Sequence, residues 1–551
     1  MPSSASVVDV PRPAQAGSRV RAVPVAVWLV VLLQVTVCLL QTAVFPNGRS
    51  PDEAKQVDLV LQVSDGTAWP WPSPGTLVTN AGVQAGAVLP PDRLQGAAHL
   101  ADRTFTPRAE RPSWTDAGGA APWIYAVDGE PFNNQLVQHP PLYYVLGAAV
   151  ARAVPDWHDA PFDQVWMILR WVNVLLAAPL PLLAWATARR LRLPEPLPLA
   201  AALAIVAIPE LTHLASSVNN DNLLVLLGAV ATWLVARVLT GDRSARTALV
   251  LGGVTSLALL TKGFALMMPA WVAVAYAASW WHARRTRGVA GATVAAALWA
   301  AFAMLPGLAW WGRNLVLYGA LQPHGTHADQ GYLTEVGGHY TWADGGVRWL
   351  HRLTDRMITL FFVQDQASLM RHDASWWAAR VGLAALVVGT VVVLVRGPLR
   401  RLDVLVLLLP AALLTAVVAK GSYEQFVAFR NLGAAQQGRY LYMAAVGMIV
   451  VAVAGAGAAK ERVRRWTPAL VLAIGLGMHT VFQVDAWKIL WMPAGPWSPA
   501  ATWAAAGAMV ELHPFGWPAL APAALATAAV VVVLAVQAVR LGRARPHGMT
   551  V

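Results

Sequence analysis

The chain has 551 residues, of which 57% are hydrophobic and only 13% charged, and its formal net charge is +12. Its apolar residues gather in repeated runs of about 20, the length that crosses a bilayer core of roughly 30 Å. This pattern predicts an all-α polytopic membrane protein and excludes an ordinary soluble domain. The arginines fall in short clusters between the runs, so the positive charge indicates membrane topology and no nucleic-acid partner.

The single cysteine, Cys38, excludes a disulfide framework or a cysteine metal site within one chain. No GK[ST] nucleotide loop is present, so ATP-driven transport is unsupported. Arginine greatly outnumbers lysine, which is typical of a GC-rich genome of actinobacterial type.

We expect about 12 transmembrane helices, within a range of about 10 to 13, after a polar cytoplasmic tail at residues 1–22. In chain order these are residues 23–45, 168–188, 197–214, 223–239, 247–262, 264–281, 290–311, 375–395, 402–419, 440–458, 467–484 and 517–539. The first run is too long for the apolar part of a signal peptide, so we interpret it as a retained anchor.

Seven basic clusters fall on one side of the membrane if the N-terminus is cytoplasmic, as the positive-inside rule requires. They are Arg12/Arg19/Arg21, Arg189/Arg190/Arg192, Arg243/Arg246, Arg284/Arg285/Arg287, Arg396/Arg400/Arg401, Lys460/Arg462/Arg464/Arg465 and Arg540/Arg543/Arg545. This topology predicts a plasma-membrane protein with both termini cytoplasmic and two large outer loops, at residues 46–167 and 312–374.

The segment 140–154 (PPLYYVLGAAVARAV) tests this topology, because treating it as a span would place the cluster at Arg189 outside. It is short and bounded by prolines. We therefore expect a helix that lies on the outer surface or is only partly inserted.

Two adjacent acids, Asp52 and Glu53, follow the first span, with Lys55 beside them. They are either solvated loop acids that cap a short helix or a general base at the membrane surface, which would take a proton from a hydroxyl. Four of the five lysines lie on the predicted outer side, against the usual bias, which indicates an anionic ligand there.

Three cations stand at outer helix ends: Lys262 in LLTKGFALMMP, Arg313 in WWGRNLVLYG and Arg439 in QQGRYLYMAA. Each alone is commonly an interfacial anchor, whereas together they can converge on one phosphate. His139 before two prolines and Asp221 in SSVNNDNLL are weaker candidates, since turn residues of these types are common.

His324 and His327, three residues apart and followed by Asp329, have a spacing that can bind zinc, but the sequence shows no third ligand in clear register with them.

In their order, the motifs SPDE, HPPLYY, SVNNDN, TKG, RNLVLYG and GRYLY resemble those of the GT-C class of membrane glycosyltransferases, over about residues 23–445. That class includes protein mannosyltransferases and aminoarabinose transferases, and the motifs are also similar to a family of largely uncharacterised bacterial membrane proteins. One departure is Ala54–Lys55–Gln56, where the related family often has a histidine. Residues 446–551, expected to form C-terminal helices and a short tail, carry no motif of this kind.

The resemblance implies an enzyme of the extracytoplasmic face that moves a sugar from a polyprenyl phosphate to a glycan, lipid or protein acceptor of the cell envelope, with inversion. Asp52 would be the general base, and Glu53 would orient it or help to hold a divalent ion. Lys55, His139, Asp221, Lys262, Arg313 and Arg439 would bind substrate. Mg²⁺ or Mn²⁺ stays open as a cofactor, because one or two carboxylates can hold such an ion beside phosphate oxygens.

Two other classes of function remain at this point. A transporter or flippase of lipid-linked sugars predicts charges near the bilayer midplane and broken helices in related halves of the chain. A non-catalytic envelope assembly protein would tolerate the loss of both carboxylates.

Overall fold

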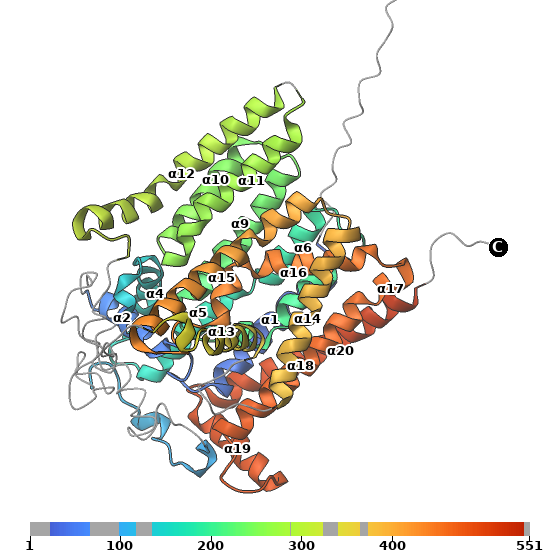
Figure 1. Cartoon of the computed structure of the whole chain (residues 1–551). Helices are drawn as coiled ribbons and strands as arrows, with labels where there is room; N and C mark the ends of the chain where they lie inside the picture. Colours follow the sequence, from blue (N-terminus) through green and yellow to red (C-terminus); the bar gives the residue numbers. More distant parts are fainter. Residues whose placement is uncertain are drawn as a thin grey trace, which may run out of the picture.

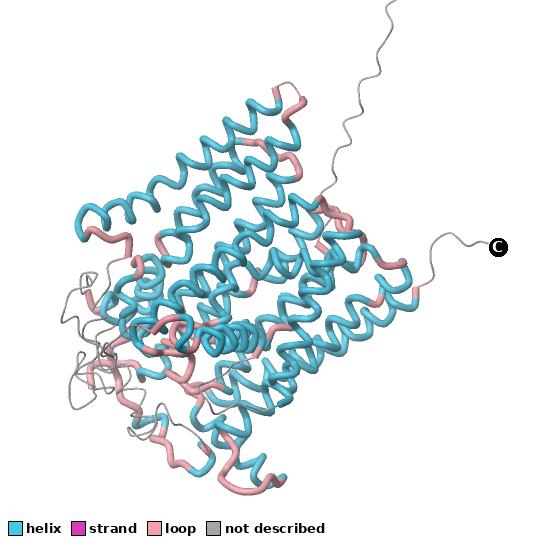
Figure 2. The backbone as a smooth tube through the Cα atoms, viewed as in Figure 1, coloured by secondary structure: helices cyan, strands magenta, loops and turns pink. Residues whose placement is uncertain are grey.

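The computed structural model describes residues 23–66, 99–116, 135–286, 288–322, 340–363 and 373–544. Within these ranges every regular element is a helix (Figures 1 and 2). The α-helices are α1 (Val25–Val44), α2 (Glu53–Ser64), α4 (Leu142–Ala153), α5 (Phe162–Ala177), α6 (Leu180–Arg190), α7 (Leu197–Val206), α8 (Pro209–Ala215), α9 (Asn220–Leu239), α10 (Ala245–Leu259), α11 (Met268–Ala283), α12 (Val289–Tyr318), α13 (Gly346–Phe362), α14 (Asp373–Arg396), α15 (Arg401–Phe429), α16 (Ala445–Gly455), α17 (Glu461–Arg465), α18 (Thr467–Leu490), α19 (Pro499–Leu512) and α20 (Gly516–Arg543). Short 3₁₀ segments join them, including η5 (Gly263–Met267) and η8 (Gly438–Ala444).

The described residues contain ten helices long and apolar enough to cross a membrane, or eleven if one bent pair counts as a span. This confirms a multi-pass, all-α membrane protein, at the lower end of the predicted number of spans. The two differences have local causes. The run 197–214 is broken into α7 and α8, bent by 62°, where Pro209 opens the second helix. The run 247–262 forms α10, whose 15 residues reach about 22 Å, short of the bilayer core.

Helices α1 and α20 are antiparallel neighbours, which sets the two ends of the bundle. Val30 and Leu33 near the start of α1 pack with Val530 and Leu534 near the end of α20, while Ala43 packs with the start of α20. The start of α1 and the end of α20 therefore share one end of the molecule.

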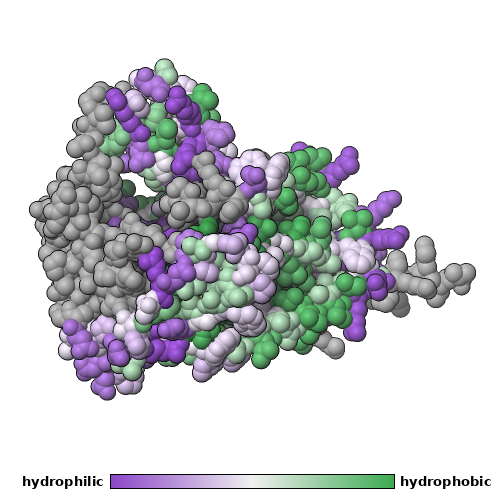
Figure 3. Space-filling model, turned by 90° about the horizontal axis from the view of Figure 1, so that it is seen from below, coloured by the Kyte–Doolittle hydropathy of each residue, from purple (hydrophilic) through white to green (hydrophobic). Residues whose placement is uncertain are grey.

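Basic residues of other helices gather at this same end. Arg189 in the last turn of α6 pairs with Glu195, whose carbonyl accepts a hydrogen bond from Arg464 of α17, and Arg465 donates to the carbonyl of Ala544 beyond α20. Figure 3 shows a hydrophobic band between hydrophilic groups at both ends. The predicted alternation of the helices thus agrees with the three-dimensional arrangement, in which Asp52 lies at the opposite end, after α1.

The segment 140–154 forms the 12-residue helix α4, which is shorter than a span and packs closely on α2. A side chain at Gly147 would come within 2.8 Å of Val60 on α2, so this contact depends on glycine. The two short helices lie together beside the ends of the long ones (Figure 1), as predicted for surface helices.

Residues 99–116 of the first predicted outer loop are attached to the C-terminal helices. The backbone N–H of His99 and of Ala101 donate to the carbonyls of Ile489 and Trp491, at 3.2 and 3.1 Å. The guanidinium groups of Arg108 and Arg111 donate to backbone carbonyls at the end of α19, from Val510 to His513. The C-terminal quarter therefore holds part of this loop in place.

Candidate active site

The loop between α1 and α2 is held by a fully buried ion pair between Glu53 and Arg170. The Nε and Nη2 atoms of Arg170 donate to the two carboxylate oxygens of Glu53, at 2.7 and 2.6 Å. The backbone N–H groups of Gly48 and Val218 also donate hydrogen bonds to the Glu53 carboxylate, each at 3.0 Å. Arg170 also donates to the carbonyls of Thr42, Phe45 and Pro46.

This geometry does not fit the prediction that Glu53 is catalytic or helps to hold a metal ion. Its side chain has no exposed surface, and both oxygens are occupied by hydrogen bonds. Glu53 instead positions the loop that carries Asp52. The signal for its partner was present in the sequence, because Arg170 is the one charged residue inside the predicted span 168–188, and such charges are costly unless paired.

Asp52 lies directly before α2 in the left-handed backbone region, with φ of 59°. Its Oδ2 accepts a hydrogen bond of 2.8 Å from Nη2 of Arg439, which is brought in by η8 near the far end of the sequence. About a third (33%) of the Asp52 side chain is accessible, whereas Arg439 is 3% exposed. Asp52 is therefore a carboxylate held by a buried cation but open to an incoming group.

Lys262 reaches the same region from the turn after α10. Its ammonium group donates to Oδ1 of Asp221 at 2.6 Å and to Oδ1 of Asn220 at 3.3 Å, both at the start of α9. It also lies 5.4 Å from the ring centre of Tyr440, the ring that Arg439 approaches at 5.5 Å. The ring of Tyr440 is thus close to both predicted cations.

The start of α9 is joined to the Asp52 loop by its capping residue. The side-chain oxygen of Asn219 caps the helix at the N–H of Asp221, and its amide donates to the carbonyl of Pro51. Asn220 also accepts from Gln56 of α2, at 3.3 Å. The motifs SPDE, SVNNDN, TKG and GRYLY, far apart in the sequence, therefore meet at one place.

Several polar atoms in this cluster have no hydrogen-bond partner among the described residues. They are Nε and Nη1 of Arg439, Nδ1 of His139, Oδ2 of Asp221 and Oε1 of Gln56, and all are buried. Such atoms are uncommon in native structures and mark a place where a ligand or water completes the bonding. Two of the three guanidinium nitrogens of Arg439 thus have no hydrogen-bond partner among the described residues, while the third donates to Asp52.

Burial and neighbouring charges shift the pKa values of Asp52 and of two groups near it. Burial raises the pKa of Asp52, but the positive charges of Arg439, Lys55 and Lys262 outweigh this, so the pKa lies below its ordinary value. Burial lowers the pKa of the half-buried Lys55, although the negative charge of Asp52 acts to raise it. Burial, reinforced by Lys262, lowers the pKa of His139 to about 3, so His139 is neutral at neutral pH.

The remaining predicted residues lie elsewhere. Arg313 is an exposed residue of α12 whose guanidinium lies 5.6 Å from the ring centre of Trp310, in the arrangement of an interfacial anchor. The structure thus brings together Asp52, Lys262, Arg439 and Asp221. Lys55 and His139 lie close enough to interact electrostatically with that group. His324, His327 and Asp329 lie outside the described residues.

A divalent ion does not fit this cluster. Asp52 is surrounded by three cations, Glu53 is fully used by Arg170, and Asp221 is paired with Lys262. In the described part of the chain no group of three or more His, Cys, Asp or Glu side chains is placed to hold a metal ion. Mg²⁺ and Mn²⁺ prefer several oxygen ligands, so the Mg²⁺ or Mn²⁺ site considered at Asp52 and Glu53 is not supported.

A second buried network, absent from the sequence predictions, supports the Asp52 loop. Oγ of Ser50 is 3.0 Å from Nε2 of His213, and Nδ1 of His213 is 3.1 Å from Oε2 of Glu210 on the same helix, α8. All three residues are buried, and the imidazole is covered by the ring of Phe45, with 3.9 Å between the ring centres. Substrate cannot reach this Ser50 hydroxyl, so the arrangement positions the loop and is no serine nucleophile.

Replacement of Ser50 by alanine should cost about 1 kcal/mol of stability, because it removes one buried hydrogen bond. It should also lower the activity about tenfold, since Asp52, two residues away, loses part of its positioning. Thr212→Val is the matched control: it removes a buried hydroxyl of α8 that donates to the carbonyl of Pro209. Thermal unfolding and initial rates would be measured for both. An equal loss of rate in the two variants would contradict a positioning role for Ser50.

Comparison with known proteins agrees with the class that these motifs indicate. Residues 162–310 match the model of the dolichyl-phosphate-mannose-protein mannosyltransferase family. This segment runs from α5 to α12 and supplies Arg170, His213, Asp221 and Lys262 to the region around Asp52. The resemblance to GT-C-type membrane glycosyltransferases is thereby confirmed over this segment.

Among solved structures, the chain is similar to ArnT from Cupriavidus metallidurans bound to undecaprenyl phosphate, with 13% identity, a TM-score of 0.45, and 95% of this chain and 76% of that chain covered. It is also similar to the oligosaccharyltransferase of Archaeoglobus fulgidus in complex with zinc and sulfate, with 11% identity, a TM-score of 0.35, and 81% and 53% covered. These similarities are too remote to assign a substrate or a catalytic residue to this chain. No curated protein sequence matches it significantly.

Proposed function

We propose that the protein is an integral-membrane glycosyltransferase that moves a sugar from a polyprenyl-phosphate donor to a hydroxyl group of a cell-envelope acceptor. The observation that carries the proposal is the pairing of an accessible carboxylate, Asp52, with the buried guanidinium of Arg439, two of whose nitrogens have no hydrogen-bond partner among the described residues. A phosphate group can accept a charge-assisted hydrogen bond from either of these two N–H groups, with Lys262 adding a second positive charge.

These positions support a single displacement. The acceptor oxygen attacks the anomeric carbon of the donor sugar and forms a new carbon–oxygen bond, while the bond from that carbon to the phosphate oxygen breaks. Asp52 accepts the proton of the acceptor hydroxyl. The electron pair stays on the departing polyprenyl phosphate, whose charge Arg439 and Lys262 stabilise. A single displacement of this kind inverts the configuration at the anomeric carbon.

Donor binding also prepares the base. In the free protein Arg439 bonds to Asp52 and holds its pKa low, and a carboxylate of low pKa is a poor proton acceptor. A donor phosphate that takes hydrogen bonds from Arg439 adds negative charge beside Asp52 and weakens the effect of the guanidinium, so it raises the pKa of Asp52. The base is thus strengthened only when the leaving group is in place.

The proposal is tested by incubating purified protein, reconstituted in lipid nanodiscs, with a panel of radiolabelled polyprenyl-phosphate sugars and envelope extract as acceptor. We expect one donor to release polyprenyl phosphate in step with labelled product of inverted configuration. Movement of intact donor across vesicle membranes without cleavage would instead establish a flippase. Cleavage with retained configuration would contradict the single displacement by way of Asp52.

Replacement of Lys262 by methionine should raise the KM for the lipid donor about tenfold or more, because it removes a charged partner of the phosphate, and change the acceptor KM less than twofold. Lys420→Met is the matched control, since Lys420 is an exposed lysine that pairs with Glu424 on α15. Initial rates at varied donor and varied acceptor provide both constants. An unchanged donor KM would leave Lys262 as a structural partner of Asp221 alone.

We place this chemistry on the extracytoplasmic face of the plasma membrane, because the basic residues of α6, α17 and α20 lie at the other end of the bundle. Single cysteines in a Cys38→Ala background report the side directly. A membrane-impermeant maleimide added to intact cells should label Asp65→Cys, at the end of α2, and should label Arg285→Cys, after α11, only in opened cells. The reverse labelling would remove the active site from the proposed face.

A further inference from the structure

We propose that the arginines of α13 form a binding surface for an anionic polymer, one that carries repeated phosphate or carboxylate groups. Arg348, Arg352 and Arg356 recur every four residues along α13. Residues at this spacing form a ridge on one side of an α-helix, which extends over about 12 Å at 1.5 Å per residue. Arg430, at the end of α15, lies in the adjoining loop, and both it and Arg348 are exposed. We call these four residues the α13 arginine surface.

Neighbouring carboxylates do not neutralise this surface. Arg352 and Arg430 take part in no ion pair with another described residue. Asp355 pairs with Arg380 of α14, and Asp344 is held in the capping box of the short turn before α13. Like charges four residues apart on a helix repel each other, so the ridge by itself lowers the stability of α13. An anionic ligand would offset this repulsion.

A role in topology or membrane anchoring does not account for these arginines. α13 lies between the end of α12 and the start of α14, at the Asp52 end of the molecule, opposite to the basic clusters that mark the proposed cytoplasmic end. Its apolar side, with Leu353 and Met357, is buried against the protein, and the indole N–H of Trp349 donates to the hydroxyl of Ser422 at 3.0 Å. α13 is therefore no helix that inserts its apolar side into the lipid interface.

The α13 arginine surface borders the loop between α15 and η8. Nε of Arg352 would lie 3.8 Å from a Cβ atom at Gly433, and Nε of Arg356 donates to the carbonyl of Gln436 at 3.4 Å. Three residues later, η8 brings Arg439 to the candidate active site. A polymer that lies along this surface therefore ends close to the proposed base.

The spacing of the arginines indicates a repeating ligand. Successive arginines of the ridge are about one helical turn apart, or roughly 6 Å along the axis. A guanidinium donates two parallel hydrogen bonds to a phosphate or a carboxylate. One small anion cannot meet arginines spread over the whole ridge, whereas a polymer with an anion on each unit can.

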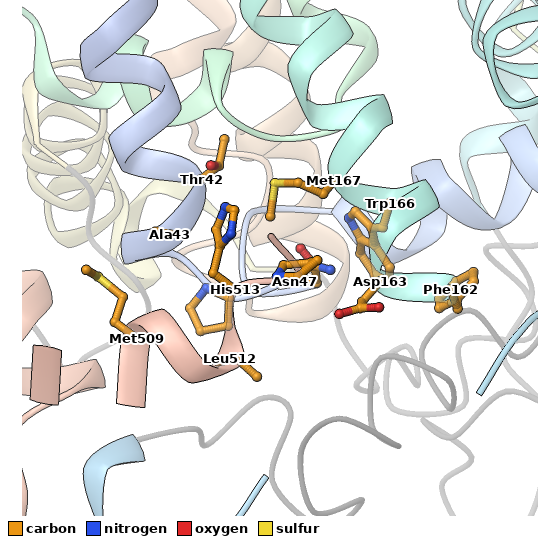
Figure 4. A pocket seen from close by; sticks show the side chains of 12 residues that line it. Thr42, Ala43, Asn47, Phe162, Asp163, Trp166, Met167, Met509, Leu512 and His513 are labelled. Carbon is orange, nitrogen blue, oxygen red and sulfur yellow. The ribbon is translucent and has the colours of Figure 1, made fainter. Parts of the chain in front are cut away.

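The pocket beside the α1–α2 loop does not offer another place for such a polymer (Figure 4). Its cavity volume is about 30 Å³, which holds about one or two water molecules. Oδ1 of Asp163 and Nε1 of Trp166 have no hydrogen-bond partner among the described residues, and such water would satisfy them. The open α13 arginine surface is thus the approach to Asp52 that the charges favour.

The assignment of this polymer as the acceptor of the sugar rests on the proposed function. The binding of an anionic polymer does not rest on it and can be measured without any transfer. Fluorescence polarisation on the full-length protein in phosphatidylcholine nanodiscs measures this binding. The probes are end-labelled oligomers of glycerol phosphate, of galacturonate and of neutral dextran, together with the labelled monomer of each.

We expect one or both anionic oligomers to bind, more weakly as salt is added, and more tightly than dextran or either anionic monomer. The double variant Arg352→Gln with Arg356→Gln should bind about tenfold more weakly or less, because two charge-assisted contacts are lost. Arg103→Gln with Arg313→Gln is the matched control: it removes the same charge from the same end of the molecule, outside the α13 arginine surface, and should bind as the original protein does.

Each outcome decides the inference. Tighter binding of an anionic oligomer than of dextran supports it and identifies the anion as phosphate or carboxylate. Equal binding of anionic and neutral oligomers, or of oligomer and monomer, overturns it with the unaltered protein alone, whether or not a variant folds. An equal loss of binding in the two double variants overturns it as well. So does the absence of polymer binding together with phosphatidylglycerol that the purified original protein retains and the Arg352→Gln, Arg356→Gln variant loses, since the surface would then hold a lipid headgroup.

Two further results separate this inference from the proposed function. Asp52→Asn should bind the oligomer normally, and if the oligomer binds but no donor is ever cleaved, the proposed function fails while the surface stands. If a donor is cleaved, the Arg352→Gln, Arg356→Gln variant should raise the KM for the acceptor and leave kcat nearly unchanged. An unchanged acceptor KM would overturn the assignment of the polymer as acceptor.

Discussion

Replacement of Asp52 by asparagine should reduce sugar transfer by about 10²–10⁴-fold, the contribution of a positioned general base. Asparagine keeps the shape of the side chain and an oxygen that can accept from Arg439, so the cluster stays assembled, but it cannot take up the acceptor proton. The release of polyprenyl phosphate from a radiolabelled donor measures the loss. Asp65→Asn, at the other end of α2 where a half-exposed Asp65 pairs with His158, is the matched control and should keep full activity.

The pH dependence adds a second measurement of the same group. Because the pKa of Asp52 lies below its ordinary value, the carboxylate stays charged as the pH falls, and the acid limb of kcat/KM should lie at lower pH than an ordinary aspartate would give. Arg439→Gln removes a charge that lowers this pKa, so the acid limb should move to higher pH. Substantial activity of Asp52→Asn, or an acid limb that Arg439→Gln leaves in place, would contradict Asp52 as the base.

Replacement of Glu53 by glutamine should destabilise the protein by about 3–5 kcal/mol, because it leaves the fully buried guanidinium of Arg170 without its counter-charge. The glutamine side chain has nearly the same shape as that of glutamate, so the effect reports charge and not packing. Thermal unfolding in nanodiscs, followed by the loss of the monodisperse protein peak, measures it. Glu424→Gln is the matched control: its partner Lys420 is exposed, and surface pairs contribute about 0–1 kcal/mol.

A double variant, Glu53→Leu with Arg170→Met, separates this cost from the value of the pair itself. It removes both charges together, so it should recover part of the stability that Glu53→Gln loses. The recovery should be incomplete, because Arg170 also binds three carbonyls of the α1–α2 loop. A double variant less stable than Glu53→Gln would show that these carbonyl contacts, and not the charge, dominate.

The fold could be predicted well from the sequence because hydrophobic length and arginine placement are one-dimensional signals. They located the elements that became α1, α9 and α12, and they identified α4 as too short to span. They did not reveal that Pro209 breaks one run into two helices or that α10 falls short of a full span. Both have local causes, the break at Pro209 and the end of α10 at Leu259, which the length of an apolar run does not register.

The candidate site could be predicted in part. The cations Lys262 and Arg439 were found by their unusual position at helix ends, and the structure brings both near Asp52. Arg313 has the same sequence signature but lies over Trp310 on an exposed face, because the orientation of a side chain around its helix is set by packing. The acids Asp52 and Glu53 look alike in sequence, and only the distant Arg170 separates their roles. His213 and Arg170 were detectable as charged or titratable groups inside apolar runs.

The attachment of residues 99–116 to α18 and α19 bears on how such proteins can diverge. Arg108 and Arg111 donate hydrogen bonds to backbone carbonyls, which every residue type possesses. The side chains at the end of α19 can therefore vary while the loop stays attached. Substitutions at the residues that supply these carbonyls can therefore leave the attachment intact, provided that the backbone keeps its position. A chimera that takes its last helices from a related protein would hold this loop only if the backbone carbonyls of those helices lie in the same positions.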